Sequence, residues 1–172
     1  MQELCSTRIV LTDASEDIDE KQEYNNRQSH ITDHWGFQCS CAQCSLSPLE
    51  KLQSDARISR IIFLRSKLLD FSATRKDMPT TQMALELIKL YEEEHLHTAM
   101  AESYMLAAIW FCIWGVTEST TRFANMALTH WLVWEKKGAW NKKMLDGLMT
   151  EPTTSWCWGL VSKGEKGLES VA

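Results

Sequence analysis

The sequence lacks several features that would place it in a familiar class of protein. It has no cluster of lysine and arginine, and its formal net charge is −5, so direct binding to nucleic acid is not expected. The longest apolar run, residues 105–116, is too short to span a membrane. The first residues show no basic segment followed by an apolar core of signal-peptide length. We therefore expect an intracellular protein, nuclear or cytoplasmic, that does not bind membranes.

Motifs of the common enzyme classes are also missing. The chain contains no Gly-x-Ser-x-Gly motif, no phosphate-binding glycine loop and no dinucleotide fingerprint. His95 and His97 alternate at the end of an expected helix and face different sides of it, which favours surface residues over a metal or acid–base pair. His130 is expected at the boundary of an apolar helix face. No residue of this chain is assigned a catalytic role.

The composition predicts a folded protein with a mainly α-helical core. The 172 residues are 44% hydrophobic and 24% charged, an ordinary balance for one globular domain. Apolar residues recur at helical spacing over most of the chain. The expected helices cover residues 55–69, 81–94, 98–114, 118–136 and 141–149, and a short exposed helix ends near residue 35.

Particular positions in these helices lead to further expectations. Thr80 or Thr81 is predicted to cap the second long helix, and the acidic run at residues 92–94 is predicted to be solvated surface. Cys112 and Cys157 are predicted to be small buried hydrophobic residues. The first long helix should bury one broad face, formed by Ile58, Ile61, Ile62, Leu64, Leu68 and Leu69. Packing inside the protein is predicted for Trp131, Trp134, Trp140, Trp156 and Trp158, and the alternative is a groove for a partner, which exposed aromatic rings would favour.

Small residues predict one close helix–helix contact. Two alanine-rich helices follow each other across Gly115, and such residues let helix axes approach closely. The alanines concerned are Ala107, Ala108, Ala124 and Ala127. We expect an antiparallel helical hairpin that resembles one tetratricopeptide-like unit, although the sequence has no clean repeat period.

The most specific signal is a group of three cysteines within six residues. Cys39, Cys41 and Cys44 lie in the segment WGFQCSCAQC, and closely spaced thiolates in a turn are typical ligands of structural zinc. Three ligands leave a tetrahedral site incomplete. His34, His30 and Cys5 are the local candidates for the fourth ligand, and the alternative is a loop that holds no metal.

These residues resemble a known family. Gly36-Phe37 followed by Cys-x-Cys-x-x-Cys, after a short charged helix, is similar to the post-SET pattern of fungal SET-domain proteins of the SET-and-MYND kind. The resemblance implies zinc bound by the three cysteines and a fourth from an upstream Asn-His-x-Cys stretch, which this sequence lacks. It also implies that Phe37 lies against the adenine of S-adenosylmethionine. The alternative is that Phe37 and Trp35 pack the cysteine loop onto its neighbour.

The same resemblance extends on both sides of the cysteines. Upstream, Arg27-Gln28 and Ile18-Asp19 match family positions, but the family's active-site tyrosine falls on Asp17. Downstream, the similar segments are Leu90-Tyr91-Glu92-Glu93-Glu94, residues 107–115 and residues 152–158. The sequence lacks the Gly-x-Gly cofactor segment and most of the SET β-fold. The resemblance therefore implies that S-adenosylmethionine binds only if a SET core is supplied.

We expect four segments along the chain. They are a remnant of the SET domain with a strand near residues 9–11 (residues 1–34), the cysteine loop (35–48), a helical domain (49–162) and a frayed tail (163–172). The leading hypothesis is a truncated or degenerate relative of protein-lysine methyltransferases, inactive alone. The alternatives are a helical module that binds a protein or peptide and retains a vestigial zinc loop, and a methyltransferase that borrows its core from another chain.

Overall fold

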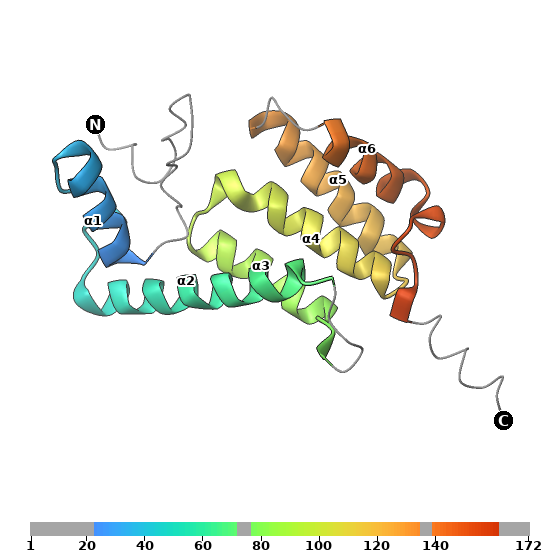
Figure 1. The fold of residues 1–172 in the computed structure, drawn as a ribbon, viewed down its shortest axis with the longest axis horizontal. Coiled ribbons are helices and arrows are strands. Elements are labelled where there is room, and N and C mark those ends of the chain that lie inside the picture. Colours follow the sequence, from blue (N-terminus) through green and yellow to red (C-terminus); the bar gives the residue numbers. More distant parts are fainter. Residues whose placement is uncertain (1–22, 72–76, 135–138, 162–172) are drawn as a thin grey trace. The chain divides into compact units, whose positions relative to one another are not determined.

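The computed structural model describes residues 23–71, 77–134 and 139–161, with the side chains of residues 132–134 and 139–141 excluded. A mainly α-helical fold is confirmed, and no strand occurs in these ranges. The expected strand at residues 9–11 and the tail beyond residue 162 lie outside them. The helices are α1 (Tyr24–Trp35), α2 (Pro48–Leu69), α3 (Thr81–Glu93), α4 (Met100–Ile113), α5 (Thr117–Trp134) and α6 (Ala139–Thr150), with short 3-10 turns η2 (His97–Ala99) and η3 (Pro152–Thr154) (Figure 1).

The chain divides into two compact units. The first comprises residues 1–63 and 90–97, and it contains α1, the cysteine loop, most of α2 and the end of α3. The second comprises residues 64–89 and 98–172, and it contains α4, α5 and α6. The expected tetratricopeptide-like array and the four-segment division stay predictions.

Helix α2 begins at Pro48, so the expected start near residue 55 is wrong. Ser47 and Glu50 form a capping box, in which the Ser47 amide donates to Glu50 Oε2 at 2.9 Å and the Glu50 amide donates to Ser47 Oγ at 3.4 Å. The interaction of the Glu50 carboxyl with the Ser47 side chain, and after it the hydrogen bond from the Ser47 amide, hold the pKa of that carboxyl below its usual value. The first turn was missed because its leucines, Leu49 and Leu52, are 65% and 68% exposed.

One face of α2 is buried, although it is narrower than expected. Ile62 and Leu69 are 51% and 40% exposed, because a helix that buries positions three and four apart turns the intervening side chains outward. The buried residues of this face are Ile58, Ile61, Leu64 and Leu68.

Within the first unit, the start of α1 is anchored on α2. Asp55 Oδ1 accepts a hydrogen bond from the Tyr24 amide at 2.7 Å, which places a carboxylate at the positive end of α1. The Lys51 ammonium lies 4.0 Å from the centroid of the Tyr24 ring, and Ser59 Oγ donates to Glu23 Oε1 at 2.7 Å. These contacts fix the helix that leads into the cysteine loop.

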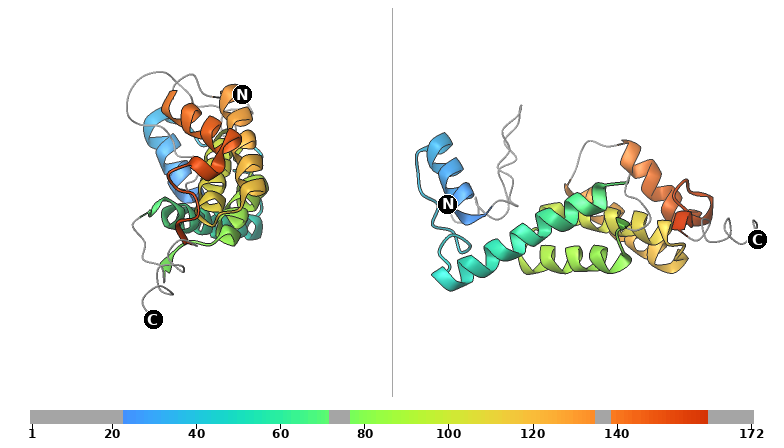
Figure 2. Two further views of the ribbon diagram at one scale, coloured as in Figure 1. Left: turned by 90° about the vertical axis from the view of Figure 1, so that its right-hand side faces the viewer. Right: turned by 60° about the horizontal axis from the view of Figure 1, so that its bottom comes forward.

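Within the second unit, α4 is buried on nearly all sides. It packs along α5, and α5 packs along α6, so the three helices lie side by side in Figure 1 and Figure 2. The expected close contact of α4 and α5 is therefore present, and its alanines, Ala107, Ala108, Ala124 and Ala127, are fully buried. The tetratricopeptide-like form of this hairpin stays a prediction. Trp110 is 1% exposed and donates from Nε1 to the Leu68 carbonyl at 2.8 Å. In the described part of the chain, no helix combines the length and apolarity needed to cross a membrane.

The outcome for the tryptophans is mixed. Trp131 and Trp158 are half-buried, but Trp156 is 61% exposed and meets Phe71 edge-on, with 6.4 Å between ring centroids. The side chains of Trp134 and Trp140 lie outside the described residues. His130 is half-buried with its ring centroid 5.2 Å from that of Tyr104, which agrees with the boundary position expected for it.

Three helices end through a residue in the left-handed conformation. Gly36 after α1 and Gly115 after α4 have φ angles of 70° and 74°. His95 after α3 has φ 56° although it carries a side chain. The Leu96 amide donates to the Tyr91 carbonyl and the His95 amide donates to the Glu92 carbonyl, a Schellman motif that turns the chain sharply after Glu94. The predicted cap at the other end of α3 is Thr80, whose Oγ1 accepts from the Met83 amide at 3.3 Å.

Two glycines offer a paired test of this backbone geometry. No heavy atom lies within 4 Å of a Cβ added at Gly36 or Gly147, so neither alanine would clash. Gly36→Ala must place a side chain at positive φ, and we expect it to lower the free energy of unfolding by about 1 kcal/mol. Gly147→Ala lies inside α6, and we expect it to raise the free energy of unfolding by about 0.5–1 kcal/mol. Urea unfolding followed by circular dichroism measures both, and shifts of the same sign would contradict this account.

Candidate metal centre

The three clustered cysteines converge on one point. Their sulfur atoms all lie within 4.8 Å of one another, with Cys41 and Cys44 buried at 6% and 4% exposure and Cys39 half-buried. None of the described cysteines forms a disulfide. In a tetrahedral zinc site with Zn–S bonds of ~2.3 Å, two sulfur ligands lie about 3.8 Å apart. A contraction of about 1 Å or less would therefore turn this cluster into three corners of a zinc site.

The end of α1 and a tight turn bring these sulfur atoms together. Gly36 ends α1 in the left-handed region, with its amide donating to the Thr32 carbonyl at 2.9 Å. The chain then reverses over the cysteines, where the Ser45 amide donates to the Cys41 carbonyl at 2.9 Å and Ser45 Oγ donates to the Ser40 carbonyl at 3.0 Å. Cys41 and Cys44 thus lie on one compact turn.

Gln28 of α1 holds the first cysteine by a two-point contact. Its Nε2 donates to the Cys39 carbonyl at 3.1 Å, and its Oε1 accepts from the Cys39 amide at 3.1 Å. A side-chain amide has both a donor and an acceptor, so it satisfies both backbone groups of one residue. Cys39 is therefore oriented by α1 before any metal binds.

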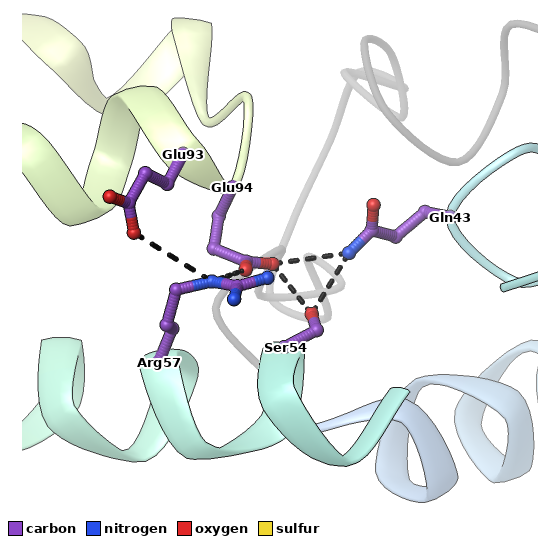
Figure 3. Close-up of polar contacts among 5 residues, drawn as sticks. All are labelled: Gln43, Ser54, Arg57, Glu93 and Glu94. Carbon is purple, nitrogen blue, oxygen red and sulfur yellow. Dashed lines mark hydrogen bonds and ion pairs between the residues drawn. The ribbon is translucent and has the colours of Figure 1, made fainter. Parts of the chain in front are cut away.

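Gln43, between Cys41 and Cys44, holds the second part of the loop. Its Nε2 donates to Ser54 Oγ at 2.9 Å and to Glu94 Oε2 at 3.1 Å (Figure 3). Ser54 Oγ in turn donates to Glu94 Oε2 at 2.6 Å. The loop is thereby joined to α2 and to the residue that follows α3.

The Glu94 carboxylate is the centre of this network. Its side chain is 1% exposed, and its Oε1 accepts from Arg57 Nε at 2.5 Å, while the other oxygen binds Ser54 and Gln43. Arg57 Nε also lies 4.0 Å from Glu93 Oε2, as Figure 3 shows. Both oxygens of a buried carboxylate are thus satisfied, as burial of a charge requires.

The expectation of a solvated acidic run at residues 92–94 is therefore wrong for Glu94. Glu92 and Glu93 are exposed as expected, whereas Glu94 is 6% exposed. The Schellman turn after Glu94 ends the helical periodicity there, and Ser54 and Arg57 supply the polar partners that make burial of the carboxylate possible.

The local candidates for a fourth ligand do not join the cluster. Among the residues that the structure describes, the potential metal-binding group contains the three cysteines and neither His30 nor His34. The two histidine rings stack on each other with centroids 4.1 Å apart, and His34 Nδ1 contacts the His30 carbonyl at 3.0 Å. His30 Nε2 is buried with no hydrogen-bond partner among the described residues. Cys5 lies outside them.

The aromatic residues beside the cluster are open to solvent. Phe37 is 46% exposed and Trp35 is 39% exposed, so neither ring is enclosed. The Trp35 ring centroid lies 5.7 Å from those of His30 and His34, which belong to the same helix, so the packing of the cysteine loop onto its neighbour by Trp35 and Phe37 stays a prediction. Asp17 and Ile18-Asp19, which the resemblance also implicates, lie outside the described residues.

His95 and His97 do not form a second centre. Both follow the end of α3, with ring centroids 5.9 Å apart, and they belong to no group of potential metal ligands within the described ranges. Both side chains are exposed, in agreement with the surface role expected for them.

Comparisons with protein-family models, with curated proteins and with solved structures found no significant match. The interpretation of this site therefore depends on its own residues. The cysteines were found by their spacing, whereas the supporting residues Gln28, Gln43, Ser54, Arg57 and Glu94 were not assigned supporting roles from the sequence. No local sequence pattern distinguishes the buried glutamate from the two exposed ones beside it, because its hydrogen-bond partners come from segments about 40 and 50 residues away.

Glu94 provides a test of how the loop is held. Glu94→Ala leaves the Arg57 guanidinium, Ser54 and Gln43 without their acceptor, and we expect the free energy of unfolding to fall by about 2 kcal/mol. Because Gln43 lies between two of the predicted zinc ligands, we also expect zinc affinity to fall by about 10–100-fold, the usual effect of removing support behind a ligand. Competition with a chromophoric chelator measures the second effect.

The matched control is Glu92→Ala, which removes an exposed carboxylate two residues away. Its effect on stability should stay within about 0.5 kcal/mol, and its zinc affinity should be that of the unaltered protein. Equal zinc affinity in the Glu94→Ala and Glu92→Ala variants would show that the network does not position the cysteines.

Proposed function

We propose that this chain carries the zinc-binding cysteine loop and the C-terminal helices of a SET-type protein-lysine methyltransferase, and that it does not transfer methyl groups by itself. The observation that carries the proposal is the convergence of Cys39, Cys41 and Cys44 soon after a helix that ends at Trp35 and is followed by Gly36-Phe37. The three converging cysteines provide the metal donors of a post-SET segment, and Trp35-Gly36-Phe37 before them resembles its sequence pattern.

Zinc would act here as a structural cross-link between the loop and the rest of the enzyme. The three thiolates supply three ligands, and in the family that this sequence resembles the fourth comes from an Asn-His-x-Cys stretch of the SET core. No such stretch occurs in this sequence. The metal would therefore join the loop to a core supplied from outside these 172 residues, and Gln28 and Gln43 would keep the loop shaped to receive it.

Phe37 is placed to contribute to a cofactor pocket. Its ring is 46% exposed and lies two residues before the first zinc ligand. An exposed aromatic face offers a surface for a purine, but one ring alone gives little affinity. S-adenosylmethionine would therefore bind when the loop and a SET core close around it, and the helical part would flank the lysine channel in that assembly.

A second candidate is a helical module that binds a protein partner, with the cysteine loop as a vestige. The observation that favours it is a pair of leucines three residues apart on the first turns of α2. Leu49 and Leu52 are 65% and 68% exposed and lie on one face of the helix. An exposed apolar helix face is typical of partner binding, and this candidate requires no metal.

Zinc stoichiometry separates the two candidates. If the loop is functional, the purified chain should bind about one zinc ion, and Ser substitution of Cys39, Cys41 or Cys44 should each abolish tight binding. Cys157→Ser is the matched control, because it removes a thiol that lies outside the cluster. Substitution by Co(II) should give thiolate charge-transfer absorption that weakens with each cluster variant. A chain without zinc whose cluster variants are unchanged would favour the helical module.

Cofactor binding tests the dependence on a core. Calorimetric titration of the chain with S-adenosylmethionine should give no binding heat. Addition of a recombinant SET core that lacks its own post-SET segment should restore binding, and Phe37→Ala should weaken it by about tenfold, the loss of one aromatic contact. Binding of S-adenosylmethionine by the chain alone would refute the claim that it is inactive by itself.

A further inference from the structure

A second pair of cysteines lies in the other compact unit, far from the metal centre in sequence. Cys112 is near the end of α4, and Cys157 is in the turn after η3. Both side chains are fully buried, and their sulfur atoms are 2.8 Å apart. The pair is buried as the sequence predicted, but the two residues meet directly rather than filling separate parts of the core.

The backbone holds these two sulfur atoms together. The Gly159 amide donates to the Cys112 carbonyl at 2.9 Å, which fastens the turn to α4 two residues beyond Cys157. On the other side, the Cys112 thiol lies 3.9 Å from the Pro152 carbonyl. The segment from Pro152 to Gly159 is thus attached to α4 on both sides of Cys157, so the approach of the sulfurs does not depend on side-chain rotamers alone.

We infer that Cys112 and Cys157 form an oxidative modification site, at which a hydroperoxide converts the two thiols into a disulfide. A bonded pair has an S–S distance of ~2.05 Å, so the sulfurs must move about 0.8 Å closer. The residue before Cys157, Trp156, is 61% exposed. The reactive turn therefore lies at the surface, and a small local opening admits an oxidant.

The chemistry of the pair supports Cys157 as the sulfur that reacts first. The hydrogen bond with Cys112 is the largest influence on the Cys157 thiol and lowers its pKa, whereas burial opposes that shift. A lowered pKa increases the thiolate fraction, and the thiolate is the nucleophile. Cys112 is then the resolving thiol, already within reach.

The reaction proceeds in two balanced steps. The Cys157 sulfur attacks one oxygen of the hydroperoxide, the O–O bond breaks, and a sulfenic acid forms with release of water or alcohol. The Cys112 sulfur then attacks the sulfenic sulfur, the S–S bond forms, and the hydroxyl leaves as water with the Cys112 proton. The two sulfurs lose two electrons in total, and the hydroperoxide gains them.

The disulfide would join α4 to the segment that follows η3 and close a loop between residues 112 and 157. Closing a loop of this size restricts the unfolded chain, so oxidation should raise the melting temperature by about 5 °C or more. This device is independent of the cysteine loop, since it uses none of the three clustered thiols.

The test is peroxide oxidation of the 172-residue chain in the presence of zinc. Mass spectrometry should show a loss of about 2 Da, and tryptic mapping under non-reducing conditions should join peptide 90–122 to peptide 144–163. Dithiothreitol should reverse both the link and the rise in melting temperature. Cys157→Ser should show neither the link nor the rise, and Cys112→Ser is a second variant with the same expectation.

Two results would overturn this inference. One is that both peptides stay reduced under peroxide treatment that oxidises other cysteines of the chain. The other is overoxidation of Cys157 without a link to Cys112. Because the mapping uses the unaltered protein, a variant that fails to fold does not affect this test, and loss of zinc binding would bear on the proposed function alone.

Discussion

The first unit depends on the hydrogen bonds and the ion pair of the buried Glu94 carboxylate. This carboxylate joins the residue after α3 to two positions of α2 and to the middle of the cysteine loop, which lie about 40 and 50 residues earlier in the sequence. A charge that is almost fully enclosed is stable only when its oxygens are paired, and here a guanidinium, a hydroxyl and an amide pair them. Because leaving the buried charge unpaired costs free energy, the hydrogen bond from Gln43 to Glu94 keeps the cysteine loop in one conformation.

The two anchors of the loop act on different cysteines. Gln28 fixes the backbone of Cys39 from α1, and Gln43 fixes the turn that carries Cys41 and Cys44 to α2 and Glu94. Each anchor uses a neutral amide, which satisfies backbone or side-chain groups without adding a charge of its own next to the three cysteines. Such an arrangement lets the loop hold its shape while the charge of the cluster is left for a metal to balance.

Helix positions were predictable where one face is buried, because periodic burial leaves a periodic sequence. This holds for α3 and α5, and for α4 the end at Gly115 was also clear. The start of α2 was missed because exposed Leu49 and Leu52 break the expected pattern, although Ser47-Pro48-Leu49-Glu50 is a capping box that short-range reading of the sequence would find. The convergence of the three cysteines was predictable from their spacing, whereas the burial of Glu94 was not, since it depends on partners that only the fold brings near.

The two-point contact between Gln28 and Cys39 also links the predicted metal site to the position of α1. A partner that binds α1 and restrains it would also restrain Cys39. Binding of the partner and binding of zinc would then each reduce the entropy cost of the other. By thermodynamic reciprocity, zinc would raise the affinity for such a partner by the same factor by which the partner raises the affinity for zinc. Zinc binding at the cysteine loop and partner binding at α1 would in that case be energetically coupled through Gln28.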